Sequence, residues 1–152
     1  MVINYLKNRL LQRQLDVELE AMLRQLALCW TLDREMADEL VSRLIAECNS
    51  SSYGNPHLFE LWCCSCLLDL WETYGGQASG SLGDLDESLA VVSQLSMLSA
   101  EERVVLTLID IAELSYRDIA YVMHVNDHDI RKLIQAARNR LLNGIRTQLE
   151  LN

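Results

Sequence analysis

The sequence has little of what marks disordered, membrane or secreted proteins. It contains one proline and six glycines in 152 residues, and its hydrophobic content of 50% predicts a folded, helix-rich protein. No apolar run approaches the ~20 residues that a membrane-spanning helix needs. The first 13 residues mix lysine, arginine and asparagine into their apolar side chains, which is unlike a signal peptide. We therefore expect a cytoplasmic protein.

Signatures of catalysis and metal binding are missing as well. The sequence contains no glycine-rich phosphate loop, no G-x-S-x-G and no H-E-x-x-H, so we expect no enzyme, no cofactor and no catalytic residue. Cys63 and Cys66 form a C-x-x-C, but they lie in an apolar helical run with no second such pair. His57 and Cys48 could complete a zinc set only by coincidence of folding. Reduced cysteines that act as small buried hydrophobic residues are the expectation.

Positive charge is scarce where a DNA-binding protein would need it. The net charge is −9, and residues 1–95 carry 14 acidic against 6 basic side chains, whereas residues 96–152 carry 8 against 7. Proteins that bind duplex DNA usually present a basic surface, because phosphate contacts supply most of their non-specific affinity. The overall field of this chain would repel DNA at low salt.

Two clusters of glycine, serine and asparagine interrupt an otherwise helical pattern. The first, residues 49–56, is typical of a turn-rich loop. The second, Tyr74 to Gly83, has four glycines in ten residues and indicates a flexible linker. The sequence thus predicts an all-α protein of two small helical bundles, residues 1–73 and 85–152, joined by a Gly/Ser-rich linker at 74–84.

Three helical segments are expected in the first bundle. Leucines at spacings of three and four predict one long helix, or two in tandem, from Val2 to Trp30. Asp33 can cap the next helix. The core face of that helix would comprise Met36, Ala37, Leu40, Val41, Leu44 and Ile45. A third helix is expected from Leu58 to about Thr73, with these side chains inward: Phe59, Trp62, Cys66, Leu67 and Leu70.

The second bundle has the pattern of a helix-turn-helix. After a short helix at 85–95, the segments 99–102 and 115–118 each form a capping box that begins a helix, and the second of these helices ends near Met123. The turn is 124–126, with Val125 as the apolar plug. The last helix runs from about Asp127 beyond Leu141. Its buried stripe would be Ile130, Leu133, Ile134, Ala137 and Leu141, and its outward face Asp127, His128, Arg131, Gln135 and Arg138.

The same residues resemble a known family. The segments 98–106 and 114–120, with Arg138 and Leu141, are similar to region 4 of bacterial RNA polymerase sigma factors of the extracytoplasmic-function type. The segments 27–33 and 37–41, with Phe59-x-x-Trp62, are similar to region 2 of that family. The resemblance covers nearly the whole chain, in the right order, with the linker in the right place.

The resemblance implies a function and its residues. Region 2 of such proteins docks on the clamp helices of core RNA polymerase and melts promoter DNA, and region 4 binds the flap and reads the more distant promoter element. Asp38, Glu39 and Ser42 fall at the polymerase contact, and an anti-sigma factor is a further possible partner. Arg117, His128, Asp129, Arg131, Lys132 and Arg138 fall where DNA is touched. Asn126 in the turn and Gln135 on the outward face of the last helix complete the candidate DNA-binding residues.

Several positions depart from the family pattern. His124 replaces the turn glycine, so a non-glycine residue has to take a left-handed conformation at a cost of roughly 1 kcal/mol. Asp129 replaces a small threonine, and Leu133 and Ala136 replace arginines. In the first half, Asp69 replaces an asparagine, Ser42 a glutamine, and residues 71–76 a basic cluster. Nearly every change removes positive charge or adds negative charge where DNA would lie.

The sequence leaves two alternatives open. A degenerate sigma mimic would keep the fold, so that an anti-sigma factor or another regulator can hold it, without reading promoter DNA. A dimeric helix-turn-helix regulator would use its first bundle for association. Arg131, Lys132 and Arg138 could also be a solvated helix face that balances the acidic chain.

Overall fold

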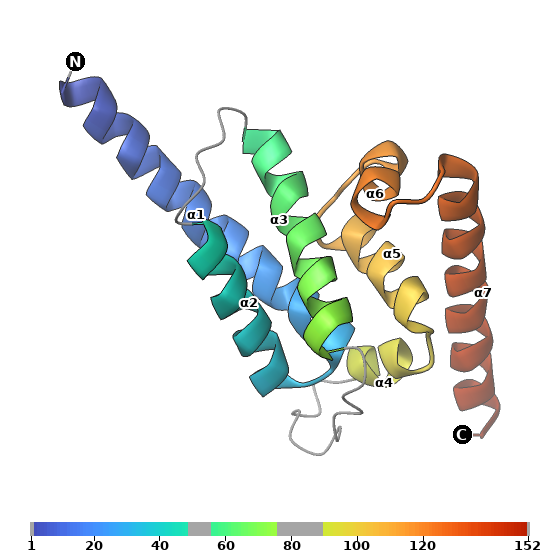
Figure 1. Ribbon diagram of the computed structural model, residues 1–152. Coiled ribbons are helices and arrows are strands. Elements are labelled where there is room, and N and C mark those ends of the chain that lie inside the picture. Colours follow the sequence, from blue (N-terminus) through green and yellow to red (C-terminus); the bar gives the residue numbers. More distant parts are fainter. Residues whose placement is uncertain (1, 49–55, 76–89, 152) are drawn as a thin grey trace.

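The computed structural model describes the backbone of residues 2–48, 56–75 and 90–151, and the side chains of residues 17–47, 57–74, 93–147, 149 and 150. These residues form seven α-helices and one π-helical turn, with no strand among them, which confirms the all-α class (Figure 1). Their bounds are α1 Val2–Thr31, α2 Arg34–Cys48, α3 Pro56–Leu70, η1 Trp71–Gly75, α4 Ala90–Ser96, α5 Ala100–Asp110, α6 Tyr116–Met123 and α7 Asp127–Leu151. Within these described ranges no helix has the length and apolar character to cross a membrane.

The helix α1 is one continuous helix, and the tight turn after it starts α2. Its second half is buried through Leu23, Leu26 and Trp30, while Figure 1 shows its first half projecting beyond the other helices. The backbone of Leu32 is left-handed, with φ of 56°. The side chain of Asp33 then accepts a hydrogen bond from the amide of Met36 at 3.2 Å, which confirms the predicted cap.

The core face expected for α2 is confirmed, but the one expected for α3 is wrong in part. In α2 the expected residues are buried or half-buried. In α3 only Leu67 of the expected set is fully buried, and Phe59, Trp62, Cys66 and Leu70 are half-buried. The buried residues are instead Leu61, Cys63, Cys64, Leu67, Leu68 and, in η1, Trp71. The reason is that α3 is apolar on nearly every side and packs against α1, α2 and α6 at once, so no single stripe describes it.

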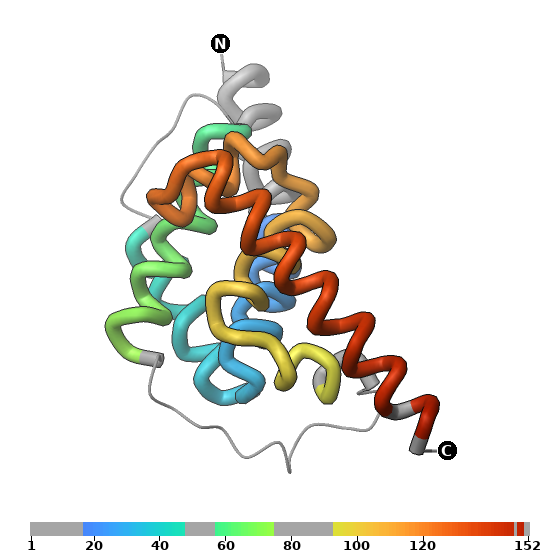
Figure 2. Tube along the Cα trace, turned by 90° about the vertical axis from the view of Figure 1, so that its right-hand side faces the viewer, coloured from blue at the N-terminus to red at the C-terminus, as the bar shows by residue number. Residues whose placement is uncertain are grey.

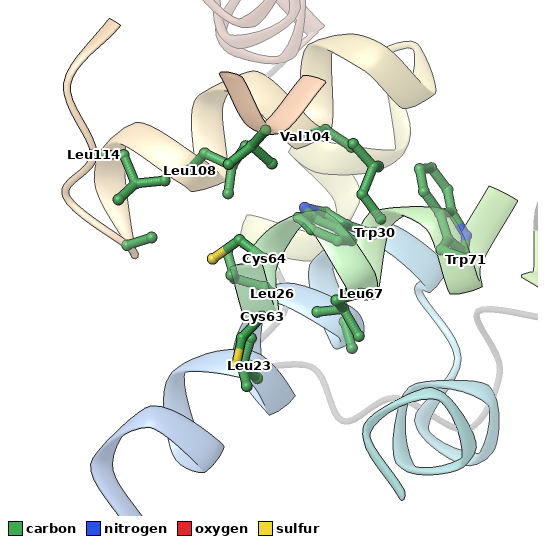
Figure 3. Close-up of a cluster of buried hydrophobic side chains, with 14 of the residues drawn as sticks. Leu23, Leu26, Trp30, Cys63, Cys64, Leu67, Trp71, Val104, Leu108 and Leu114 are labelled. Carbon is green, nitrogen blue, oxygen red and sulfur yellow. The ribbon is translucent and has the colours of Figure 1, made fainter. Parts of the chain in front are cut away.

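Both predicted halves contribute to one continuous core. Trp30, Cys64 and Leu67 of the first half belong to the same buried cluster as Val104, Leu108 and Leu114 of the second (Figure 3). In this structure the two halves therefore pack together and share one core. Tyr74 and Gly75, expected in the linker, complete η1, and residues 76–84 lie outside the described residues, so the linker itself stays a prediction.

The two capping boxes differ in completeness. Ser99 accepts from the amide of Glu102 at 3.2 Å, and the Glu102 carboxylate accepts from the amide of Ser99 at 3.4 Å, so the first box is complete. Ser115 accepts from the amide of Asp118 at 3.1 Å. The carboxylate of Asp118 turns instead to His57 of α3. The second segment is therefore a simple N-cap, and the freed carboxylate joins two helices.

Candidate nucleic-acid and polymerase interfaces

The segment from α6 to α7 has helix-turn-helix geometry. Ile119 and Val122 are fully buried, and Val125 in the turn is half-buried against the same core, where the sequence placed the plug. His124 ends α6 in the left-handed conformation, at φ 57° and ψ 40°, as its position in the turn required. The amide of Val125 donates to the carbonyl of Ala120 at 3.1 Å and closes the turn. Local hydrogen bonds thus fix the direction in which α7 leaves.

Asn126 begins α7 and has a structural partner. Its side-chain oxygen accepts a hydrogen bond from the amide of Asp129 at 2.8 Å, so the amide group of Asn126 serves as the N-cap. The side chain is exposed, but a DNA contact would have to share this oxygen or use the amide nitrogen. Its role in DNA binding stays a prediction.

The candidate DNA-binding residues all lie on the surface. All eight side chains are exposed: Arg117, Asn126, His128, Asp129, Arg131, Lys132, Gln135 and Arg138. Arg131 lies over the ring of Tyr116 at 6.0 Å from guanidinium carbon to ring centroid, a contact between α7 and the start of α6. Within the described side chains no carboxylate forms an ion pair with Arg117, Arg131, Lys132 or Arg138. These cations are available to phosphate groups.

Two carboxylates stand at the start of the same helix. Asp127 and Asp129 occupy the first turn of α7, where the positive end of the helix dipole favours them. The same helix end would otherwise attract a phosphate group. The positive charge of this surface therefore lies one to three turns further along α7, at Arg131, Lys132 and Arg138.

The candidate polymerase-binding residues lie on the exposed side of α2. The carboxylate of Asp38 accepts from Arg24 of α1 at 2.8 Å, and Arg24 also bonds Glu20 at 2.8 Å. Glu39 bonds Arg43 at 3.0 Å, and the guanidinium of Arg43 lies 4.3 Å from the centroid of the Tyr74 ring. Ser42 is exposed beside them. Asp38 and Glu39 are thus held in defined positions, although exposed pairs of this kind contribute little stability.

Two contacts that sequence reasoning missed join the halves. The indole nitrogen of Trp30 donates to the hydroxyl of Thr107 at 2.7 Å in the buried core. His57 Nε2 lies 3.1 Å from Asp118 Oδ2 near the surface. Neither pair has a local sequence signal, because the partners are 77 and 61 positions apart.

The cysteines lie where small hydrophobic residues would. Cys63 and Cys64 are buried, and burial raises the pKa of the Cys64 thiol to about 12, which keeps it protonated. Cys66 is half-buried, and the side chain of Cys48 lies outside the described residues. Among the residues that the structure describes, no group of three or more histidine, cysteine or acidic side chains could hold a metal ion.

Comparisons with known proteins agree with this geometry. Residues 88–141 match the family model "Sigma-70, region 4". No curated protein sequence matches the chain. The fold is similar to that of a chain in the co-crystal structure of the sigma factor RpoE with the anti-sigma factor NepR from Bartonella quintana. The TM-score is 0.69 at 23% identity, and the match covers 90% of this chain and 96% of that one.

The fold and the α6–α7 segment together define an all-α protein with a C-terminal helix-turn-helix of the region 4 type. Residues 88–141 thus match region 4 of sigma factors, and the fold of the chain is similar to that of a solved sigma factor structure. The match to region 4 supports a sigma-factor-like role in transcription initiation.

Proposed function

We propose that this protein binds core RNA polymerase and directs it to promoters through α7. The single observation that carries the proposal is that three exposed cations of α7, Arg131, Lys132 and Arg138, have no carboxylate partner among the described side chains. Arg131 and Arg138 lie seven positions apart, on one face of the helix, so both can approach the same groove. The chain itself catalyses nothing in this role; the polymerase supplies the chemistry.

The acidic character of the chain should weaken its own binding to DNA. With Asp127 and Asp129 at the first turn of α7, the protein alone should bind DNA weakly. The polymerase would supply most of the affinity for DNA. Asp38, Glu39 and Ser42 of α2 would contact the polymerase. Both candidate surfaces are exposed in the packed state of the two halves.

The test combines polymerase binding with promoter-specific transcription. The full chain is mixed with core RNA polymerase, co-elution is measured, and transcription is scored on a library of DNA fragments. Arg131→Ala and Arg138→Ala should keep co-elution and lose specific transcripts, whereas Asp38→Ala with Glu39→Ala should lose co-elution. Asn143→Asp makes the same change in net charge on another face of α7 and should leave both readouts unchanged. Absence of co-elution by the wild-type chain would reject the proposal.

A second candidate function is a sigma mimic held by an anti-sigma factor. The observation that favours it is the carboxylate of Asp129 on the surface that would face DNA. The structurally similar sigma factor was crystallised with an anti-sigma factor. Tight binding of an anti-sigma factor, without polymerase co-elution or transcripts, would favour this function over the first. A stable homodimer that shifts palindromic DNA without polymerase would instead favour a dimeric regulator.

A further inference from the structure

A line of residues along α7 changes from polar to apolar on its way to the C-terminus. Positions 131, 135, 138, 142, 145 and 149 alternate in spacing between four and three, so they share one face of the helix. We call this line the α7 ridge. Its first half carries Arg131, Gln135 and Arg138, and its second half carries Leu142, Ile145 and Leu149. The second half has no role in the proposed reading of DNA.

The second half of the ridge is uncovered within the described part of the chain. Leu142 is 55% exposed and Leu149 is 71% exposed, and Ile145 is half-buried. The other side of α7 is covered, because Ala137 is fully buried and Gly144 lies so close to Met97 that an added Cβ would be 2.7 Å from its Cε. Figure 2 shows this end of α7 extending past the rest of the molecule.

Two arginines give this apolar surface a positive border. Arg138 lies on the ridge one turn before Leu142, and Arg146 lies one turn after it; both are exposed. Neither forms an ion pair among the described side chains. Two such cations on one helix are unusual in a chain whose net charge is −9. An apolar helix face bordered by cations is complementary to an amphipathic helix with acidic flanks.

We propose that the second half of the α7 ridge is a docking surface for an acidic amphipathic helix of another protein. The leucines would fill the apolar face of that helix, and Arg138 and Arg146 would pair with its carboxylates. The charges disfavour a second copy of this chain as the occupant. A parallel pair of ridges places Arg138 against Arg138, and an antiparallel pair centred on Ile145 brings the two Arg146 side chains together.

The experiment measures peptide binding to the full chain by fluorescence anisotropy. The probes are two labelled helical peptides of about three heptads with leucine at a and d. One carries glutamate at e and g, and the other carries lysine. The glutamate peptide should bind, and the lysine peptide should bind at least about tenfold more weakly. Leu142→Glu and Leu149→Glu should each lower the affinity for the glutamate peptide by roughly tenfold or more, since each variant loses one leucine that the peptide would bury.

Charge reversal and a matched variant make the test specific. Arg146→Glu should lower the affinity for the glutamate peptide and raise the affinity for the lysine peptide. Thr147→Glu adds a negative charge to an exposed position on the side of α7 away from the ridge and should leave the affinity within about twofold of wild type, provided that each variant keeps its thermal midpoint. Equal binding of both peptides, no binding, or equal losses at Thr147 and Leu142 would overturn the proposal. A homodimer in sedimentation that Leu142→Glu abolishes would overturn it too, because a second copy would then cover the ridge. The assay contains neither polymerase nor DNA, so its result is independent of the proposed function.

Discussion

The indole of Trp30 donates a hydrogen bond of 2.7 Å to the hydroxyl of Thr107 at the centre of the core. Trp30 is fully buried near the end of α1, and Thr107 is 4% exposed in α5. The Thr107 hydroxyl in turn donates to a carbonyl of its own helix, to Arg103 at 2.7 Å or Val104 at 3.0 Å. Both polar groups are therefore satisfied, and the bond joins the first half of the chain to the second.

Thr107→Val should destabilise the fold by about 1–3 kcal/mol, because it leaves the buried indole N–H of Trp30 without an acceptor. The measurement is the free energy of unfolding in urea. Thr147→Val is the matched control, since the hydroxyl of Thr147 bonds only its own exposed helix, at the carbonyl of Asn143. The double variant Trp30→Phe/Thr107→Val should lose less stability than the sum of the losses in the two single variants. Purely additive losses would mean that the two residues do not interact.

His124→Gly should stabilise the protein by up to about 1 kcal/mol, because glycine adopts the left-handed conformation without steric cost. The backbone of His124 has φ of 57° and ends α6. Thermal unfolding measures the effect. Tyr121→Gly, one turn earlier at an exposed helical position, should instead destabilise by about 1 kcal/mol. A loss of stability in His124→Gly would contradict the idea that this turn is strained.

Asp129→Thr should strengthen DNA binding by the polymerase complex, because it removes a carboxylate from the surface that we place toward phosphate. Arg131→Ala should weaken binding and reduce the slope of affinity against salt concentration by about 1. Electrophoretic mobility shift at several salt concentrations measures both effects. Glu101→Gln removes the same charge from the first turn of α5 and should leave the affinity unchanged. An Asp129→Thr affinity equal to wild type would count against α7 as the DNA-facing helix.

Glu60→Gln should stabilise the protein at neutral pH and lose this advantage in acid. Burial raises the pKa of Glu60, and the nearby carboxylate of Asp118 raises it further, while His57 lowers it. A glutamate whose pKa is higher in the folded state than in the unfolded state stabilises the fold less as pH rises through that pKa. The glutamine variant has no such loss. The difference in thermal midpoint should therefore shrink toward zero below pH ~4.3, the ordinary value for glutamate.

Much of the local structure could be predicted because its causes are local. Ser99 and Glu102 cap α5 through residues three apart, and Asp33 caps α2 in the same way. The left-handed conformation of His124 was expected from the resemblance, because the related family has a glycine at this position of the turn. The exposure of Arg131 and Arg138 followed from the period of the apolar stripe on α7.

What the sequence alone determined, then, is the helices, their caps and the outward face of α7, since neighbours within one helical turn decide them. Only the tertiary structure decided which side of α3 is buried, because that helix is apolar all round and its neighbours select the face. Only the tertiary structure, likewise, placed Trp30 against Thr107 and His57 against Asp118. Those contacts depend on how two distant parts of the chain pack, and no periodicity along a sequence encodes a pairing between helices so far apart.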